Sequence, residues 1–234
     1  MRAIKERETL RARRRDFYAS FLSRGDLVYD VGANIGERTE ALLDVGCRVV
    51  AVEPQPECCR ILRSMQSGHS LLTIVEKACG REVGRAELRT GGGTDVLASL
   101  SPDYMRGVAE SGRFANHAWK DVLSVEVVSL DQLIGQFGMP AYVKIDVEGF
   151  ETEVLAGLSD GPKMLSFEFT PELSKSMLAC LSHCQRLGLQ EFNLSYGESM
   201  RFARSEWVTF DRICQVVSAL AGDNSLFGDI FARR

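Results

Sequence analysis

The stretch Asp30-Val-Gly-Ala-Asn-Ile-Gly36 and the pair Glu53-Pro54 have residue types and spacing suited to holding a nucleoside. Two glycines in the first stretch allow the backbone to approach a ligand closely and to take torsion angles that other residues avoid. Glu53 ends the next apolar run, about 20 residues further on, where an ionised carboxylate can accept hydrogen bonds from both hydroxyls of a ribose. The pattern predicts a strand, a tight turn and a helix that bind a nucleotide or nucleoside.

The spacing of the glycines distinguishes between ligands. A dinucleotide turn requires G-x-G-x-x-G, whereas Gly32 and Gly36 give G-x-x-x-G, and the chain contains no G-x-x-x-x-G-K-[ST] motif. Asp30 precedes the turn, and its negative charge would repel a pyrophosphate but suits a ligand with an ammonium and a sulfonium group. The ligand that fits is S-adenosylmethionine. The alternative is a glycine-rich turn that serves only close packing.

A second group of charged residues lies in Lys144-Ile-Asp-Val-Glu-Gly-Phe-Glu151. Lys144, Asp146 and Glu148 alternate with a period of two, so they share one face where a strand leaves the sheet. Acids there could stabilise the sulfonium and the ammonium, and one could accept a proton from the hydroxyl that receives a methyl group. Methyl transfer is an in-line displacement, so most catalysis should come from positioning, and a general base typically adds about 10²–10⁴-fold.

The candidate catalytic residues are Asp146, Glu148, Glu168 and His117. Glu168 lies at the same edge of a later strand, and His117 lies in the expected lid and is of the residue type most often used as a general acid or base. Non-catalytic alternatives remain for each: Lys144 could simply neutralise Asp146, the first-turn acids Glu148 and Glu151 could oppose a helix dipole, Glu168 could be a partly buried carboxylate paired with a cation, and a loop histidine is commonly exposed. The pattern identifies no metal ligand and leaves open whether a divalent cation assists the acids.

Apolar runs alternate with helical patterns along the chain, which predicts a parallel sheet with helices on both faces. Strands are expected at Leu27–Val31, Cys47–Val52, Leu71–Val75, Ala141–Asp146, Met164–Phe169, Leu189–Leu194 and Phe227–Ala232. Helices are expected near the N-terminus, at 36–45, 55–66, 129–137, 172–187 and 208–221, and from the Glu148-Gly-Phe-Glu151 block to about Leu158. Ligands of such sheets bind at the carboxyl ends of the strands, where the strand order reverses.

The rhythm breaks between Arg85 and a strand expected at Val122–Val128. Ala86–Arg89 predicts a short extra strand, and Gly91-Gly92-Gly93 predicts a flexible hinge. Residues 94–121 predict an irregular connection, which at this length is commonly a lid or a disordered segment. Its aromatic content favours a mobile cover over a substrate pocket, with disorder as the alternative.

The glycine turn, Glu53-Pro54, the Lys144–Glu151 block and the closing Asp229-Ile-Phe-Ala-Arg-Arg234 together resemble the FkbM family of S-adenosylmethionine-dependent methyltransferases. The resemblance covers residues 25–234 and leaves residues 1–24 as a helical extension. It implies an α/β class I methyltransferase fold, with a Rossmann-like, seven-stranded, mostly parallel sheet and an antiparallel C-terminal strand. It also implies O-methylation of a hydroxyl on a small molecule, a sugar or a secondary metabolite.

Several residues are then expected in the donor pocket. Those beside the methionine and ribose are Asp30, Gly32, Asn34, Gly36, Glu53, Pro54 and Asp146. Thr39 could bond the donor's carboxylate, because the N–H groups of a helix start favour anions; a plain helix residue is the alternative. Lys77 and Ala78 would flank the adenine, although many class I enzymes carry an acid or amide there and this chain has Glu76-Lys77-Ala78.

Composition narrows the functional classes. The net charge of −4 argues against a broad nucleic-acid surface. The basic cluster at 11–15 predicts a solvated helix face, with partner binding as the alternative. The seven scattered cysteines predict buried free thiols in a reducing compartment. No signal peptide and no membrane span are apparent, so a cytoplasmic protein with a small-molecule or glycan acceptor is expected.

Two rival functions remain. An NAD-dependent dehydrogenase would need the missing G-x-G-x-x-G turn. A protein of the same fold could bind the cofactor or a partner without turnover. A nucleic-acid methyltransferase is disfavoured by the charge and by Asp-Val-Glu-Gly at 146–149, where base methylation usually employs an Asn/Asp-Pro-Pro-aromatic motif.

Overall fold

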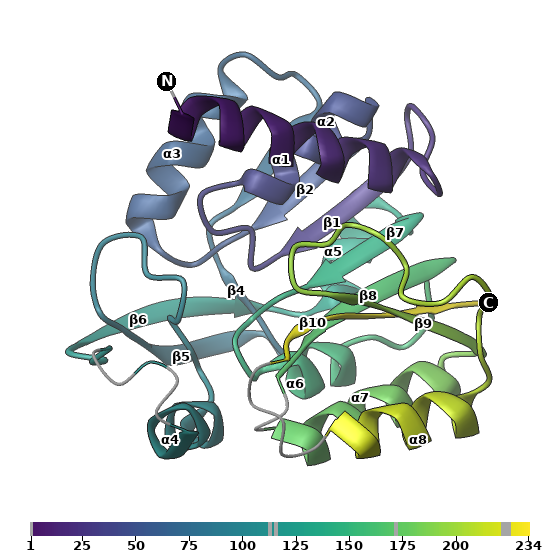
Figure 1. The fold of residues 1–234 in the computed structure, drawn as a ribbon. Coiled ribbons are helices and arrows are strands. Elements are labelled where there is room, and N and C mark those ends of the chain that lie inside the picture. Colours follow the sequence, from purple (N-terminus) through teal and green to yellow (C-terminus); the bar gives the residue numbers. More distant parts are fainter. Residues whose placement is uncertain (1, 112–113, 115–116, 171–172, 221–225) are drawn as a thin grey trace.

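A seven-stranded sheet forms the centre of the molecule in a computed structural model that describes residues 2–111, 114, 117–170, 173–220 and 226–234 (Figure 1). Its strands are β1 (Leu27–Val31), β2 (Arg48–Val52), β3 (Leu72–Val75), β7 (Tyr142–Ile145), β8 (Met164–Phe169), β9 (Glu191–Tyr196) and β10 (Gly228–Arg233), in the order β3-β2-β1-β7-β8-β10-β9. Among the described strands of this sheet, β10 pairs antiparallel with β8 and β9, and the other neighbouring strands pair parallel. The expected class I methyltransferase sheet is confirmed, and its order reverses between β1 and β7.

Helices cover both faces of this sheet, as expected (Figure 1). One face carries α1 (Arg2–Ala19), α2 (Glu37–Val45) and α3 (Pro56–Gln66), and the other carries α5 (Leu130–Phe137), α6 (Glu151–Ala156), α7 (Ser174–Arg186) and α8 (Phe210–Leu220). Residue 172 of the helix expected at 172–187 and residue 221 of that expected at 208–221 lie outside the described residues. Within the described ranges, no helix is long and apolar enough to span a membrane.

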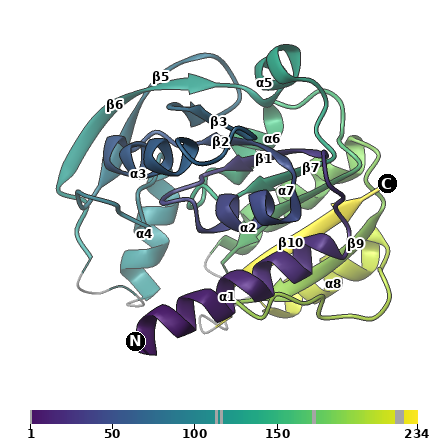
Figure 2. The ribbon, with the colours of Figure 1, turned by 90° about the horizontal axis from the view of Figure 1, so that it is seen from above.

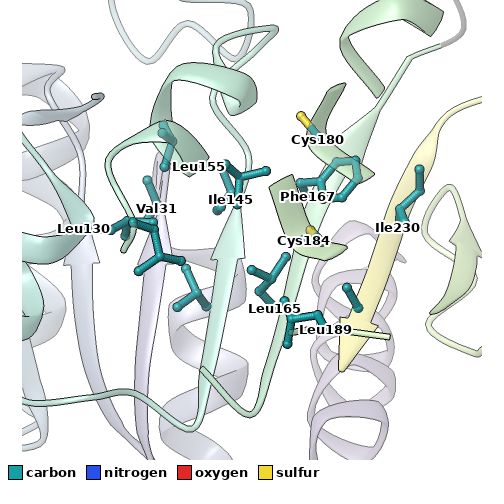
Figure 3. Close-up of a cluster of buried hydrophobic side chains, with 14 of the residues drawn as sticks. Val31, Leu130, Ile145, Leu155, Leu165, Phe167, Cys180, Cys184, Leu189 and Ile230 are labelled. Carbon is teal, nitrogen blue, oxygen red and sulfur yellow. The ribbon is translucent and has the colours of Figure 1, made fainter. Parts of the chain in front are cut away.

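Alternation along the central strands divides the core in two. Val28 of β1 is buried against α1, α2 and α3, whereas its neighbour Tyr29 and Val31 are buried with α5 to α8, because successive strand residues face opposite sides. Figure 3 shows the core between the sheet and α5 to α8, where Cys180 and Cys184 of α7 lie among apolar side chains of the sheet. All seven cysteines are free thiols and six are buried, which confirms the expectation of buried free thiols. Burial of each large apolar side chain contributes about 1.5–3 kcal/mol, and together they hold the strand ends that carry the site.

A second, three-stranded sheet lies beside the main one (Figure 1). Its central strand β6 (Asp121–Val128) pairs parallel with β4 (Ala78–Cys79) and antiparallel with β5 (Gly84–Thr90). β5 and β6 match the two strands expected in this region, while β4 has no counterpart among the expectations. The short β4 begins where the chain leaves β3 and so ties the small sheet to the edge of the large one.

The expectation of an irregular connection over 94–121 is wrong in part, because residues Pro102–Ser111 form the helix α4. Tyr104 and Val108 lie one turn apart and pack with Leu97 in a small buried cluster, which stabilises the helix. Trp119 secures the returning chain by donating from Nε1 to the carbonyl oxygen of Leu97, at 2.7 Å. Residues 112–113 and 115–116 lie outside the described residues, and the lid remains a prediction.

Helix α1 lies beside α2 (Figure 2) and closes the first core with an aromatic cluster. The ring of Phe17 contacts those of Phe202 and Phe231 at centroid distances of 5.0 and 5.6 Å. Arg13 and Arg15 are exposed, as the solvated-face interpretation of this helix predicts.

The same interpretation is wrong for Arg14, which is only 5% exposed. Its guanidinium pairs with Glu37 of α2 at 2.7 Å and with Glu198, which follows β9, at 3.2 Å. Packing of α1 against α2 brings this charge inward, which the local sequence pattern does not reveal.

Candidate functional site

A cavity of about 390 Å³ lies at the carboxyl ends of β1, β2 and β7, where the sheet order reverses. This volume is in the range of about 300–1,000 Å³ that is common for small-molecule sites. The predicted site residues that line it are Gly32, Asn34, Glu53, Pro54, Lys77, Ala78, Asp146, Glu148 and Glu168. The sheet therefore brings most of the predicted residues together at one edge.

Glu53 joins the first two strand ends. Its Oε2 accepts a hydrogen bond from the backbone N–H of Asn34 at 2.8 Å, and its Oε1 accepts one from the N–H of Gln55, also at 2.8 Å. Burial to 2% exposure raises the pKa of Glu53 to about 7, although these hydrogen bonds oppose the shift. Each carboxylate oxygen has a further lone pair, so the side chain could still accept from a ribose diol.

The two glycines of the turn serve different purposes. Gly32 has a φ of +83°, and a Cβ added to it would lie 1.7 Å from the carbonyl oxygen of Asp146. Only glycine allows this approach of the turn to the loop after β7. Gly36, with a φ of +86°, does not line the cavity; an added Cβ would lie 2.7 Å from the side chain of Leu62 on α3.

Asp30 and Thr39 lie beneath the turn and do not line the cavity. The hydroxyl of Thr39 donates to Oδ2 of Asp30 at 2.6 Å, and both side chains are buried. Burial raises the pKa of Asp30, and the charge of Lys144, its register partner on β7, opposes that rise. Asp30 and Gly36 thus lie outside the cavity lining and the hydroxyl of Thr39 bonds Asp30, so the contact of these three residues with the donor stays a prediction.

The wall beyond β3 is mainly apolar. Its members are Ala78, Cys79, Leu88, Val96, Ala98 and Leu100. Lys77 also lines the cavity, and its ammonium pairs with Glu126 of β6 at 2.7 Å. An apolar slot closed by the small sheet is suited to the flat face of a nucleobase.

Asp95 belongs to this wall and was not identified from the sequence. Its carbonyl oxygen accepts from Nε2 of Gln55 at 2.9 Å, and its N–H donates to Oε1 of the same amide at 3.1 Å. The pair ties the 94–121 segment to the end of β2. No motif announces it, because the two residues lie 40 positions apart.

His117 does not line the cavity. Its Nε2 lies 3.4 Å from Oδ2 of Asp95, and its ring meets that of Trp119 edge-on at 4.7 Å. The geometry supports a role in holding the 94–121 segment and gives no support to the catalytic role considered from the sequence.

Three carboxylates converge in the cavity. Single oxygens of Asp146, Glu148 and Glu168 all lie within 4.8 Å of one another. Burial and the neighbouring negative charges raise the pKa values of Glu148 and Glu168 well above their usual range. Burial also acts to raise the pKa of Asp146, but the ammonium of Lys144, 2.5 Å from Oδ2, outweighs it and lowers that pKa.

A turn, and not the strand itself, places Glu148. β7 ends at Ile145, and Glu148 has a left-handed φ of +53°. Its side chain accepts a hydrogen bond from the hydroxyl of Tyr104, and its carbonyl oxygen accepts one from Oγ of Ser99 at 2.6 Å. The period-two argument therefore predicts the right neighbours, while residues from the 94–121 segment fix their orientation.

The side chain of Glu151 is hydrogen-bonded to the backbone of this turn. Its Oε1 accepts from the N–H groups of Val147 and Gly149 at 3.2 and 3.1 Å. These bonds give Glu151 a structural role in the turn before α6, and burial raises its pKa to about 7 despite them.

The three carboxylates could also act as oxygen ligands of a divalent cation. The ammonium of Lys144 is 2% exposed and already compensates one of the charges. The cluster is therefore suited to sharing protons as well as to binding a cation.

Comparison with known proteins places this geometry in a family context. A family model described as the methyltransferase FkbM domain matches residues 30–217. The hexuronic acid methyltransferase AglP of Haloferax volcanii is 27% identical over 144 residues, which are 61% of this chain. The chain spans about half of that protein, 54% of its length.

Solved structures show a general likeness. The precorrin-6y C5,15-methyltransferase of Geobacter metallireducens has a TM-score of 0.46 at 12% identity, covering 97% of this chain and 87% of that one. An S-adenosylmethionine-dependent O-methyltransferase of Thermotoga maritima has a TM-score of 0.43 at 13% identity, covering 94% and 64%.

Proposed function

The chain belongs to the FkbM methyltransferase family, and on that premise we propose that it transfers the methyl group of S-adenosylmethionine to a hydroxyl oxygen of a sugar or another small molecule. S-adenosylmethionine is the methyl donor of the family. The observation that carries the proposal is that Glu53 and the cluster of Asp146, Glu148 and Glu168 line one cavity. The side chain proposed to accept hydrogen bonds from the ribose diol and the carboxylates that could act as bases thus line the same cavity.

In the proposed reaction Glu168 is the general base. Asp146 is held by the ammonium of Lys144 and Glu148 by the hydroxyl of Tyr104, whereas Glu168 has its hydrogen bond within the cluster, to Asp146; we therefore assign Glu168 to the acceptor hydroxyl. The proton of the acceptor hydroxyl passes to Glu168, the oxygen forms a bond to the methyl carbon, and the carbon–sulfur bond breaks. S-adenosylhomocysteine leaves as a neutral sulfide, so the cavity loses the positive charge that the acids stabilise.

A relative supports a sugar as the acceptor, because the named activity of AglP is methylation of a hexuronic acid. The acceptor and the oxygen that receives the methyl group are proposals for this chain. The same fold without turnover remains the competing function.

Incubation with labelled S-adenosylmethionine and a panel of neutral sugars, acid sugars and other hydroxylated metabolites tests the proposal. Glu168→Gln should lower kcat by about 10²–10⁴-fold while the affinity for S-adenosylhomocysteine stays constant. Glu153→Gln, on the exposed side of α6 beside Arg81, is the matched control and should behave as the wild type. Donor uptake without transfer to any acceptor would favour the binding protein, and a methyl group found on nitrogen or carbon would contradict O-methylation.

A further inference from the structure

Two largely buried arginine side chains line the cavity where α1 and α2 meet. Arg14 comes from α1 with its side chain 6% exposed, and Arg38 comes from the first turn of α2 with its side chain 15% exposed. Both line the cavity. Neither belongs to a motif, and Arg14 lies outside the residues that the family model matches.

Two acids that also line the cavity pair with these guanidinium groups. Glu198 bridges them, with its Oε2 at 3.2 Å from Arg14 and its Oε1 at 2.8 Å from Arg38. Glu37 contacts Arg14 at 2.7 Å. The side chains of Glu198 and Glu37 are 44% and 38% exposed, so the acids face solvent more than the arginines do.

Arg38 retains more hydrogen-bond donors for a ligand than Arg14, whose Nε and Nη2 bond Glu198 and whose Nη1 pairs with Glu37. Among the described residues, the hydrogen bonds of Arg38 engage Nη1 once, with Sδ of Met200 at 3.2 Å, and Nη2 once, with Glu198. A guanidinium carries five N–H donors in a planar fork. This fork matches the two oxygens of a carboxylate better than an ammonium does.

The charges on the rest of the cavity wall favour the place beside Arg14 and Arg38 for a negatively charged ligand group. Acids dominate the other charged walls, at Glu53, Asp95, Asp146, Glu148 and Glu168. The two lysines of the lining are each matched by one carboxylate, Lys144 at 2.5 Å and Lys77 at 2.7 Å. Beside Arg14 and Arg38 the lining has two cations for the two acids Glu37 and Glu198, whereas the other walls have more acids than cations, so an anionic ligand group meets less repulsion beside the arginines.

We propose that Arg14 and Arg38 form a subsite for a carboxylate of a bound ligand. The proposal rests on the proposed function, because it takes the cavity as the place where donor and acceptor meet. Two ligands can supply the carboxylate: the amino-acid tail of the donor, or an acid sugar that accepts the methyl group. For the donor tail, Arg38 would take the role that the sequence suggests for its neighbour Thr39.

The first experiment compares two nucleosides by calorimetry. S-adenosylhomocysteine has the amino-acid tail, whereas 5′-methylthioadenosine has the same thioether nucleoside without it. If the tail occupies the subsite, Arg38→Met and Arg14→Met should weaken binding of S-adenosylhomocysteine by about 10- to 100-fold and leave binding of methylthioadenosine unchanged. The second experiment titrates glucuronate and glucose into protein saturated with S-adenosylhomocysteine, where an acceptor subsite predicts a loss confined to glucuronate.

Arg11→Met is the matched control. Arg11 also lies on α1 and pairs with Glu40 and Asp44 of α2 at 2.6 Å each, but it is not part of the cavity wall. It should lower stability while both affinities stay at the wild-type value. Rescue of part of the affinity by Arg38→Lys, which restores the charge without the fork, would further support the subsite.

The outcomes separate clearly. A loss confined to either carboxylate ligand supports the subsite and identifies its source. Wild-type affinities in both Arg38→Met and Arg14→Met, or an equal loss in Arg11→Met, would overturn it. Methyl transfer by the wild type tests the proposed function separately, so unchanged variants of an active enzyme refute the subsite alone, and a wild type that binds neither nucleoside refutes both.

Discussion

The backbone N–H of Asn34 donates to Oε2 of Glu53 over 2.8 Å, and this bond joins the turn after β1 to the end of β2. The side chain that we propose for the ribose thus also holds the turn that surrounds the ligand. Replacing Glu53 by alanine would leave two backbone N–H groups without their acceptor. Glutamine retains an acceptor oxygen and is the better probe of the charge.

Donor affinity should rise between pH 6 and pH 8. Burial raises the pKa of Glu53 to about 7, and the ribose hydroxyls donate to the ionised form. The ionised fraction rises from about one tenth to about nine tenths over this interval, which predicts about tenfold tighter binding at pH 8. Calorimetry with S-adenosylhomocysteine measures this, and an equally steep pH dependence in Glu53→Gln would argue against Glu53 as the titrating group.

Gly32→Ala should be far more damaging than Gly25→Ala. Both glycines have a positive φ, +83° and +89°, but a Cβ at Gly32 would collide with the carbonyl oxygen of Asp146 at 1.7 Å, whereas nothing lies within 4 Å of one at Gly25. The left-handed backbone alone costs about 1–2 kcal/mol, and the collision should add about 1–3 kcal/mol or more at Gly32. Urea unfolding of both variants measures the difference, and equal losses would show that the close approach is unimportant.

Lys144→Met should destabilise the protein by about 3–5 kcal/mol, because it leaves the carboxylate of Asp146 without its buried partner. Arg81→Met provides the comparison, since Arg81 and Glu153 form an exposed pair and the loss there should be slight. Both values come from denaturant unfolding. Similar stabilities of the two variants would mean that solvent compensates Asp146.

Tyr104→Phe should lower kcat about tenfold, because its hydroxyl donates to the carboxylate of Glu148. Affinity for S-adenosylhomocysteine should stay constant, as expected for a positioning residue. Tyr29→Phe is the control: its hydroxyl donates to the carbonyl oxygens of Leu133 and Gly138 at 3.0 and 2.6 Å, away from the cavity, so only stability should fall. A wild-type kcat in Tyr104→Phe would mean that α4 does not contribute to methyl transfer through this hydroxyl group.

Removal of divalent cations should leave the methyl-transfer rate unchanged. The ammonium of Lys144 lies 2.5 Å from Asp146 and supplies a positive charge where a cation would bind. Rates with a chelator and with added Mg²⁺ measure this. A rate that falls with the chelator and recovers with Mg²⁺ would assign the three carboxylates as metal ligands.

Local patterns were sufficient for the central part of the site. The period of two identifies the strands and the shared edge of Asp146 and Glu148, and the glycine spacing with Glu53 identifies residues that line the same cavity. These features depend on residues close in sequence and on the rule that parallel strands place their carboxyl ends together. Direction within the turn is less predictable, since Gly32 lines the cavity while Asp30 and Gly36 do not.

The amino-acid sequence by itself determined the seven-stranded α/β sheet, the glycine turn and the carboxylates at the strand ends, because each follows from a short local pattern. Only the tertiary structure decided that Arg14 of α1 meets Glu198, 184 positions away, beside Arg38, and that α4 brings Tyr104 to Glu148. Such contacts depend on how whole helices pack on the sheet. Packing is set by the sum of many side-chain volumes, which no local spacing records.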